Sequence, residues 1–295
     1  MGLLSPACTY SEQLMGDVEV EVGRQVGDFI LSEIENCRKW LEEQGYPLEF
    51  RVAQAWAKSG FHVRQSVFYD DPETNLPREL DVLAHHQRTA VSKTTAASFT
   101  TALTFLIECK SSRDAPWIVL CGVNSEKLTL PIFVQRWLVV GDKEELVRNE
   151  LSRAWWSKAE IFREIDLIGH GIVRAHKKSG TDLPFHAVKQ VLSATHGRAK
   201  KIAAAGEHNR CHLLFPVVVT DAHLFGAWLT PNGELELKEV PRATLFFESE
   251  SGTFLSPPII VVTIDGLEEF LLAVREMKGI CELSEEIVGP WKKEA

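Results

Sequence analysis

The sequence predicts an α/β protein, folded as one elaborated domain over residues 1–295. Three observations lead to this expectation. Segments with the 3.6-residue period of an amphipathic helix stand between segments that alternate like strands. The chain is 45% hydrophobic and 25% charged, which is ordinary for a globular protein with a substantial core. No tract rich in glycine, serine or proline divides it, and no internal repeat appears.

The first part of the chain predicts two helices and then three strands. Apolar residues at near-helical spacing predict a helix over 17–44. A second helix over 48–59 ends at Gly60 and should turn four side chains inward: Phe50, Ala53, Trp56 and Ala57. Strands are expected at 61–69, 79–86 and 102–110, and the third, the most apolar, should be central in the sheet. The stretch 87–102, rich in Ser, Thr and Ala, reads as a loop or a hairpin tip.

The later part is less regular. Residues 116–120 read as a short strand or a packed loop, and 131–168 contains Trp-rich helical segments. A helix is expected over 184–205, with Pro184 near its start. Further strands are expected at 213–220, 233–240 and 257–264, and a closing helix at 266–277.

Several sequence features indicate the cellular compartment of the protein. No segment has the form of a secretion signal, and no run approaches the ~20 apolar residues of a membrane span. The six cysteines include no C-x-x-C pair, and Cys109 and Cys211 lie in apolar segments. We therefore expect buried free thiols, a cytoplasmic protein and no membrane partner.

The stretch FLIECKSS, residues 105–112, poses a question of charge burial, because an apolar strand ends in Glu108 and Lys110. Alternation puts these two side chains on one face of the strand. In the preceding strand Leu80 and Val82 should face one way and Asp81 the other. If the strands pair, Asp81 and Glu108 converge with Lys110 beside them. Paired carboxylates favour a hard cation such as Mg²⁺, or Mn²⁺ in its place.

Two other Glu-x-Lys triplets compete with this one. Glu276 and Lys278 lie on an expected helix, where positions i and i+2 do not share a face, and read as surface charge. Glu236 and Lys238 lie in GELELKEV, whose alternation is typical of an outer strand with a solvated face. Charges at the end of a buried strand need a stronger reason. We therefore favour the triplet at Glu108.

A helix, a strand, a turn, and then RELDVLA and FLIECKSS resemble the core of the PD-(D/E)XK, or restriction-endonuclease-like, nucleases over about residues 45–120. The resemblance implies an αβββαβ core with a central mixed sheet flanked by helices, and C-terminal strand and helix additions. Asp81 matches the family's single aspartate, Glu108 and Lys110 match its (D/E)-x-K, and Leu80 replaces the proline. Glu49 matches an acid that many members place near the metal, although a first-turn acid also suits the helix dipole.

The resemblance implies a metal-dependent nuclease that hydrolyses phosphodiester bonds, usually in DNA. The catalytic residues would be Asp81, Glu108, Lys110 and Glu49, and the three carboxylates would hold Mg²⁺ or Mn²⁺. A different class of function also stays open, a non-catalytic module that binds nucleic acid or protein on a nuclease-like fold. The charge cluster favours the enzyme, because a binding module has no need of it.

The partner expected from charge is a nucleic acid. Although the net charge is −9, residues 151–210 carry 11 basic and 5 acidic side chains, a local charge of +6. On a wheel of the 184–205 helix the inward side holds Val188, Val191, Leu192, Thr195, Ala199 and Ile202. The outward side holds Lys189, His196 and Lys200, with Lys201 further round, as a phosphate track or a plain solvated face. A second copy of the chain or another protein also stays open as a partner.

Overall fold

The computed structural model describes residues 29–91, 98–122, 138–141, 144, 167–176, 182–206, 208–247 and 256–278. The chain forms two compact units, and the boundary between them lies between Pro47 and Leu48. In the first unit, residues 29–44 are helical, and the start of the helix expected at 17–44 lies outside the described residues. This helix exposes apolar side chains along its length, namely Phe29, Ile30, Leu31, Ile34 and Trp40.

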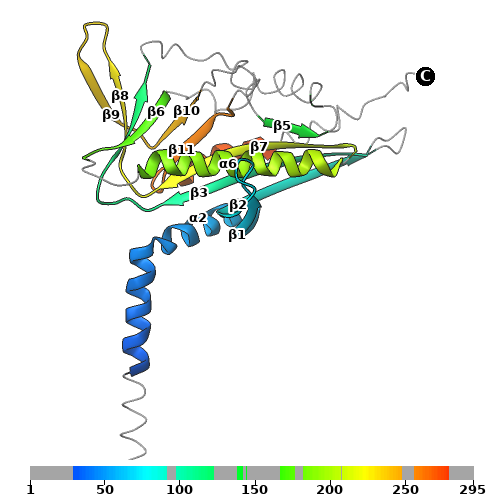
Figure 1. Cartoon of the computed structure of the whole chain (residues 1–295), viewed down its shortest axis with the longest axis horizontal. Coiled ribbons are helices and arrows are strands. Elements are labelled where there is room, and N and C mark those ends of the chain that lie inside the picture. The colour runs from blue at the N-terminus through cyan, green and yellow to red at the C-terminus, as the bar shows by residue number, and fades with distance from the viewer. Residues whose placement is uncertain are drawn as a thin grey trace, which may run out of the picture. The chain divides into compact units, whose positions relative to one another are not determined.

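The second unit is built on one sheet, and the expected α/β class is confirmed (Figure 1). Its described strands are β1 (His62–Asp70), β2 (Pro77–Val91), β3 (Ser98–Lys110), β4 (Trp117–Cys121), β5 (Leu138–Gly141), β6 (Ile168–Arg174), β7 (Arg210–Thr220), β8 (Leu224–Leu229), β9 (Leu235–Glu239), β10 (Arg242–Leu245) and β11 (Ile259–Thr263). The described helices that accompany the sheet are α2 (Tyr46–Lys58), α6 (Leu183–Ala205) and α7 (Leu267–Met277).

The sheet is mixed and runs in the order β1-β2-β3-β7-β11-β10-β6-β4-β8-β9, with β5 paired to the first half of β7. β1, β2 and β3 pair antiparallel, and β7 then joins β3 in parallel after the crossover through α6. β3 therefore lies inside the sheet, as its apolar sequence predicted, and nearly all of its side chains are buried.

Helices cover both faces of the sheet around β3. Ile107 packs in one apolar cluster with Trp56 of α2 and Phe270 of α7. Leu106, which points the other way, packs in a second cluster with Val188 and Val191 of α6. Figure 1 shows α6 lying along the sheet over β3 and β7. The wheel of α6 is largely confirmed, since Val188, Val191, Thr195 and Ile202 are buried and Leu192 and Ala199 pack partly buried beside them.

Two of the four side chains expected inward on α2 are exposed. Ala53 and Trp56 are buried as predicted, but Phe50 and Ala57 face solvent. The buried stripe is instead Leu48, Val52, Ala53 and Trp56. Leu48 lies on the inward side near the start of the helix, and Val52 and Trp56, at positions i+4 and i+8, continue the same face.

Contacts at the end of α2 correct the expectation that Lys278, of the competing triplet Glu276-x-Lys278, is surface charge. Gly60 has a positive φ of 78°, which suits the C-cap glycine predicted there. The Lys278 ammonium donates hydrogen bonds to the carbonyls of Ser59 and Gly60 at 2.6 and 2.9 Å. It also lies 4.5 Å from the centre of the Phe61 ring. Lys278 is therefore a cap of α2 and not plain surface charge.

The β2–β3 hairpin is longer than expected. Residues 87–91 and 98–102 belong to the strands and not to a loop, and 92–97 lie outside the described residues. Thr89 pairs with Thr100 in the ladder, and their hydroxyls lie 2.8 Å apart. Cross-strand hydroxyl pairs of this kind make a threonine-rich segment compatible with a sheet.

Other differences fall later in the chain. Residues 117–121 form a strand, which resolves the choice left open at 116–120. β5, β6, β8 and β10 were not predicted. Most of the expected helical stretch 131–168 lies outside the described residues, but β5 falls within it and is a strand, because it pairs with β7. Cys109 and Cys211 are buried thiols, as expected.

Candidate active site

Asp81 and Glu108 lie at neighbouring positions of the paired strands β2 and β3. The ladder joins Val82 to Ile107, so its next step towards the end of β3 brings Asp81 to Glu108. The Asp81 Oδ2 atom accepts a hydrogen bond from the backbone amide of Cys109 at 2.7 Å. This bond ties the carboxylate of one strand to the backbone of the next and fixes where it lies.

The alternation of β2 breaks at Asp81, contrary to expectation. Val82 packs in the cluster of α2, whereas Leu80 packs in the cluster of α6, so the two side chains do not face the same way. On β1 the ladder pairs Gln65 with Val82 and Val67 with Leu80 but skips the step between them. Ser66 stands at that step with a φ of 52°, an unusual backbone conformation for a residue with a side chain. The irregular backbone therefore lies directly beside Asp81.

Glu108 is a charged side chain inside the core. It is 1% exposed, and its Oε1 atom accepts a hydrogen bond from the Lys110 ammonium at 2.5 Å. Its Oε2 atom is buried without a hydrogen-bond partner among the described residues. A buried carboxylate oxygen without a donor is costly, so this atom has capacity for a further ligand.

The pKa values show that the cluster is short of positive charge. Burial raises the pKa of Glu108 to about 7, the Asp81 carboxylate adds to the rise, and Lys110 opposes it. Burial also raises the pKa of Asp81, against the effect of Lys110 and of the Cys109 amide. Burial alone would lower the pKa of Lys110, but Glu108 and Asp81 outweigh it, and the pKa is raised. One ammonium thus serves more than one carboxylate.

Glu49 belongs electrostatically to the same cluster. It lies in the first turn of α2, and its side chain is partly buried. Burial raises its pKa to about 7, Asp81 adds to the rise, and Lys110 opposes it. A first-turn acid that served only the helix dipole would have its charged form favoured. Glu49 is therefore close enough to Asp81, Glu108 and Lys110 for their charges to act on one another.

Asp221 holds the segment that leaves the site, a role that the sequence did not indicate. Its carboxylate accepts hydrogen bonds from the Ser111 hydroxyl, the Ser112 amide and the Arg113 guanidinium at 2.7–2.8 Å. The Thr220 hydroxyl donates to the Lys110 carbonyl at 2.9 Å. These contacts fix the two serines of FLIECKSS. Asp221 directly follows β7, and only the parallel pairing of β7 with β3 shows that it lies beside the end of β3.

Gln190 of α6 is part-buried, and its Oε1 atom is buried without a hydrogen-bond partner in the described part of the chain. A glutamine on a helix would ordinarily be expected to be solvated. The Tyr69 hydroxyl of β1 donates to the Gln190 carbonyl at 3.3 Å. Burial raises the pKa of Tyr69, and the negative charge of Glu108 contributes to the rise. Tyr69 of β1 therefore lies near the carboxylate cluster, and its hydroxyl links β1 to α6.

The basic residues predicted on α6 divide into two kinds. Lys189, Lys200 and Lys201 are exposed, and Lys189 lies 3.9 Å from Glu73 in a solvated ion pair. His196 is only partly exposed, and burial lowers its pKa, so it adds no positive charge near neutral pH. The basic character expected for His196 is therefore corrected: it lies part-buried on this face as a neutral side chain.

The competing pair Glu236 and Lys238 lies on β9, which ends the order of the described strands and is exposed at every residue. Solvation was expected for one face, but both faces of this strand are exposed. The pair therefore lacks the burial that distinguishes Glu108 and Lys110.

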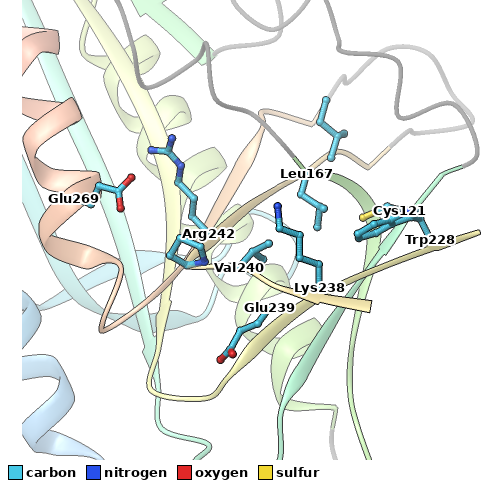
Figure 2. Close-up of a pocket in the computed structure, with 10 residues that line it drawn as sticks. Cys121, Leu167, Trp228, Lys238, Glu239, Val240, Arg242 and Glu269 are labelled. Carbon is cyan, nitrogen blue, oxygen red and sulfur yellow. The ribbon is translucent and has the colours of Figure 1, made fainter. Parts of the chain in front are cut away.

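A pocket of about 450 Å³ lies elsewhere in the second unit (Figure 2). Its lining includes Cys121, Leu167, Trp228, Lys238 and Arg242. None of the four predicted catalytic residues lines it. The pocket therefore adds no residue to the carboxylate cluster.

Comparisons with family models, with curated proteins and with solved structures found no match. No described helix is both long and apolar enough to cross a membrane. Within the described residues, no group of three or more His, Cys, Asp and Glu side chains is arranged as a metal site. Mg²⁺ commonly uses one or two carboxylates and keeps several waters, so the carboxylate cluster must be judged by its own chemistry.

The pKa of Glu108 predicts how stability depends on pH when no metal is present. Its pKa rises from an ordinary 4.5 to about 7 on folding. An acid of this kind favours the folded state only while it is protonated, so its contribution falls as the pH rises from about 4.5 to 7. Glu108→Gln removes that contribution. In EDTA, the free energy of unfolding of the variant relative to wild type should therefore increase between about pH 5 and pH 8.

Urea unfolding measured at several pH values tests this expectation. Glu236→Gln, on exposed β9, is the control and should give a constant difference. A difference for Glu108→Gln that stays constant, or falls with pH, would contradict the raised pKa.

Proposed function

We propose that the protein is a divalent-metal-dependent nuclease of the PD-(D/E)XK kind, which hydrolyses phosphodiester bonds in DNA and acts in the cytoplasm. The observation that carries the proposal is the convergence of Asp81 with the buried Glu108 and Lys110 at the ends of two paired strands. The elements α2, β1, β2, β3, α6 and β7 follow one another in the αβββαβ sequence that the resemblance implies, although β4, β5 and β6 stand between β3 and α6. β7 pairs in parallel with β3. These features support the proposal.

The carboxylates fit a hard divalent cation. Asp81 and Glu108, with Glu49 nearby, offer oxygen donors, which are the ligands that Mg²⁺ and Mn²⁺ prefer. Glu108 Oε2 is buried without a hydrogen-bond partner in the described part of the chain, and the pKa values of all three acids are raised. A bound cation would satisfy both features, and it would supply a Lewis acid that polarises a phosphate oxygen.

The chain's own residues would do the positioning. The Cys109 amide holds Asp81, and the Lys110 ammonium holds one oxygen of Glu108. Lys110 is part-exposed, so its ammonium can also reach a solvent or substrate oxygen beside the carboxylates. There it would orient a water molecule or stabilise charge that develops on the phosphate. Asp221 would keep the segment after Lys110 in one position.

The test of this function is cleavage by single variants. Asp81→Ala, Glu108→Ala and Lys110→Ala should each lower Mg²⁺-dependent cleavage at least about a hundredfold, because each removes a group at the reacting phosphate. Cleavage of supercoiled, linear and single-stranded DNA should be measured with Mg²⁺, with Mn²⁺ and in EDTA.

The matched controls are Glu236→Ala and Lys238→Ala, the same residue types in the exposed triplet, which should keep wild-type activity. Full activity in any of the first three variants, or cleavage that persists in EDTA, would contradict the site. A wild-type protein that binds DNA but cleaves none would favour the non-catalytic binding module.

The outward face of α6 is the proposed phosphate track, formed by Lys189, Lys200 and Lys201, with His196 within it as a neutral side chain. Phosphate contacts release counterions, so log affinity should fall linearly with log salt. In a Glu108→Ala background, Lys189→Ala with Lys200→Ala should lower the magnitude of that slope by roughly one unit for each lysine in contact.

DNA affinity measured across a salt series gives the slope. Lys58→Ala, an exposed lysine on α2, is the control and should leave the slope unchanged. A double variant with the wild-type slope would leave the α6 face as ordinary solvated surface.

A further inference from the structure

The outer edge of β9 has an unusual composition. β9 ends the order of the described strands, so one side of its backbone faces no other described strand. Its sequence is Leu-Glu-Leu-Lys-Glu, and its two leucines, Leu235 and Leu237, are 67% and 52% exposed. Exposed edge strands are templates for pairing with another chain, and proteins usually protect them.

The backbone groups that face this edge can be identified from the β8–β9 ladder. The Val240 amide donates to the Leu224 carbonyl, and the Thr230 amide donates to the Glu234 carbonyl. Because hydrogen-bonded positions alternate along an antiparallel strand, the even positions of β9 bond to β8. Leu235, Leu237 and Glu239 therefore turn their amides and carbonyls to the outer edge.

We propose that β9 pairs antiparallel with β9 of a second copy of this chain, with Leu237 opposite its symmetry mate. A two-fold axis produces this kind of pairing, in which both copies use the same surface. Leu237 then exchanges hydrogen bonds with itself, and Leu235 exchanges them with Glu239 of the other copy. About six backbone hydrogen bonds would join the two edges, all from groups that β8 leaves unused.

The charges select this register. With Leu237 at the centre, Glu236 stands opposite Lys238 of the other copy, and Lys238 stands opposite Glu236. These two pairs fall at non-hydrogen-bonded steps, where opposite side chains lie closest and unlike charges attract. Glu236 and Lys238 are both exposed in the monomer, so their charges are accessible to a second copy.

The neighbouring registers fit worse. Centring the pair on Leu235 would set Glu234 directly opposite Glu236, which is a like-charge pair. Centring it on Glu239 would set Leu237 opposite Pro241, which has no amide hydrogen to donate. Only the register at Leu237 satisfies both the charges and the hydrogen bonds.

The apolar side chains support the same partner. Leu229 of β8 pairs with Leu235, and it is 52% exposed. Leu229, Leu235 and Leu237 thus lie on one face of the hairpin, and Glu236 and Lys238 on the other. Figure 2 shows the alternation directly, with Lys238 and Glu239 pointing to opposite sides of β9. In the pairing the leucine face continues across the two-fold axis, where Leu237 meets its symmetry mate.

Charge reversal tests the register. Glu236→Lys alone would set two lysines opposite each other at both steps, and Lys238→Glu alone would set two glutamates opposite each other. Each should raise the dimer dissociation constant at least tenfold in sedimentation equilibrium of the full chain. The double variant Glu236→Lys/Lys238→Glu restores opposite charges and should dimerise like wild type. An equimolar mixture of the two single variants should form a heterodimer, because their charges are complementary.

The control is Glu268→Lys, the same charge change at an exposed position of α7, which should not alter dimerisation. Leu237→Pro provides an independent measurement. It removes an amide that β8 does not use, so it should abolish the dimer while circular dichroism shows a folded protein. A wild-type chain that is monomeric at high micromolar concentration would overturn the proposal. A dimer that the single charge reversals leave unchanged, or that the double variant fails to restore, would also overturn it.

Discussion

The burial of Glu108 is the constraint on which the site depends. Burying a carboxylate inside an apolar sheet costs free energy unless a cation or hydrogen-bond donors stabilise its charge, and Glu108 is almost fully buried. Lys110 neutralises one of its oxygens from the same strand, and Asp81 is held beside it by the amide of Cys109. The carboxylates of Glu49, Asp81 and Glu108 therefore outnumber the single ammonium of Lys110. Burial, together with the negative charge of Asp81, raises the pKa values of Glu49 and Glu108.

The fold makes this burial stable by surrounding β3. β2 and β7 flank the strand, and α2 and α6 cover its two faces. Glu49 reaches the cluster from the first turn of α2, and Tyr69 of β1 lies near Glu108 and donates a hydrogen bond to α6. The pieces that form the site are therefore the same pieces that form the core. The pocket beside β8 and β9 lies apart from it.

The sequence was informative where one rule acted alone. The apolar run that ends in Glu108 predicted a buried central strand, and the 3.6-residue period of α6 predicted its inward face. Prediction failed where the conformation of a residue depends on another strand that lies beside it in the fold. The side to which Leu80 points depends on the backbone of Ser66, which lies in another strand. Thr89 and Thr100 read as loop residues until their strands pair. The role of Asp221 likewise required the parallel pairing of β3 with β7.

The central claim is that the acids at Glu108 take up a divalent cation and lose protons as they do so, since metal binding requires the ionised carboxylates. Calorimetric titration of Mn²⁺ into the wild-type protein tests it, with two buffers of different ionisation enthalpy at each pH. Because the pKa values of Glu49 and Glu108 are about 7, we predict net proton release at pH 7 that vanishes by about pH 9, and no saturable binding in Asp81→Asn/Glu108→Gln. Binding heats that are the same in both buffers at pH 7, or unchanged binding in the double variant, would contradict the account.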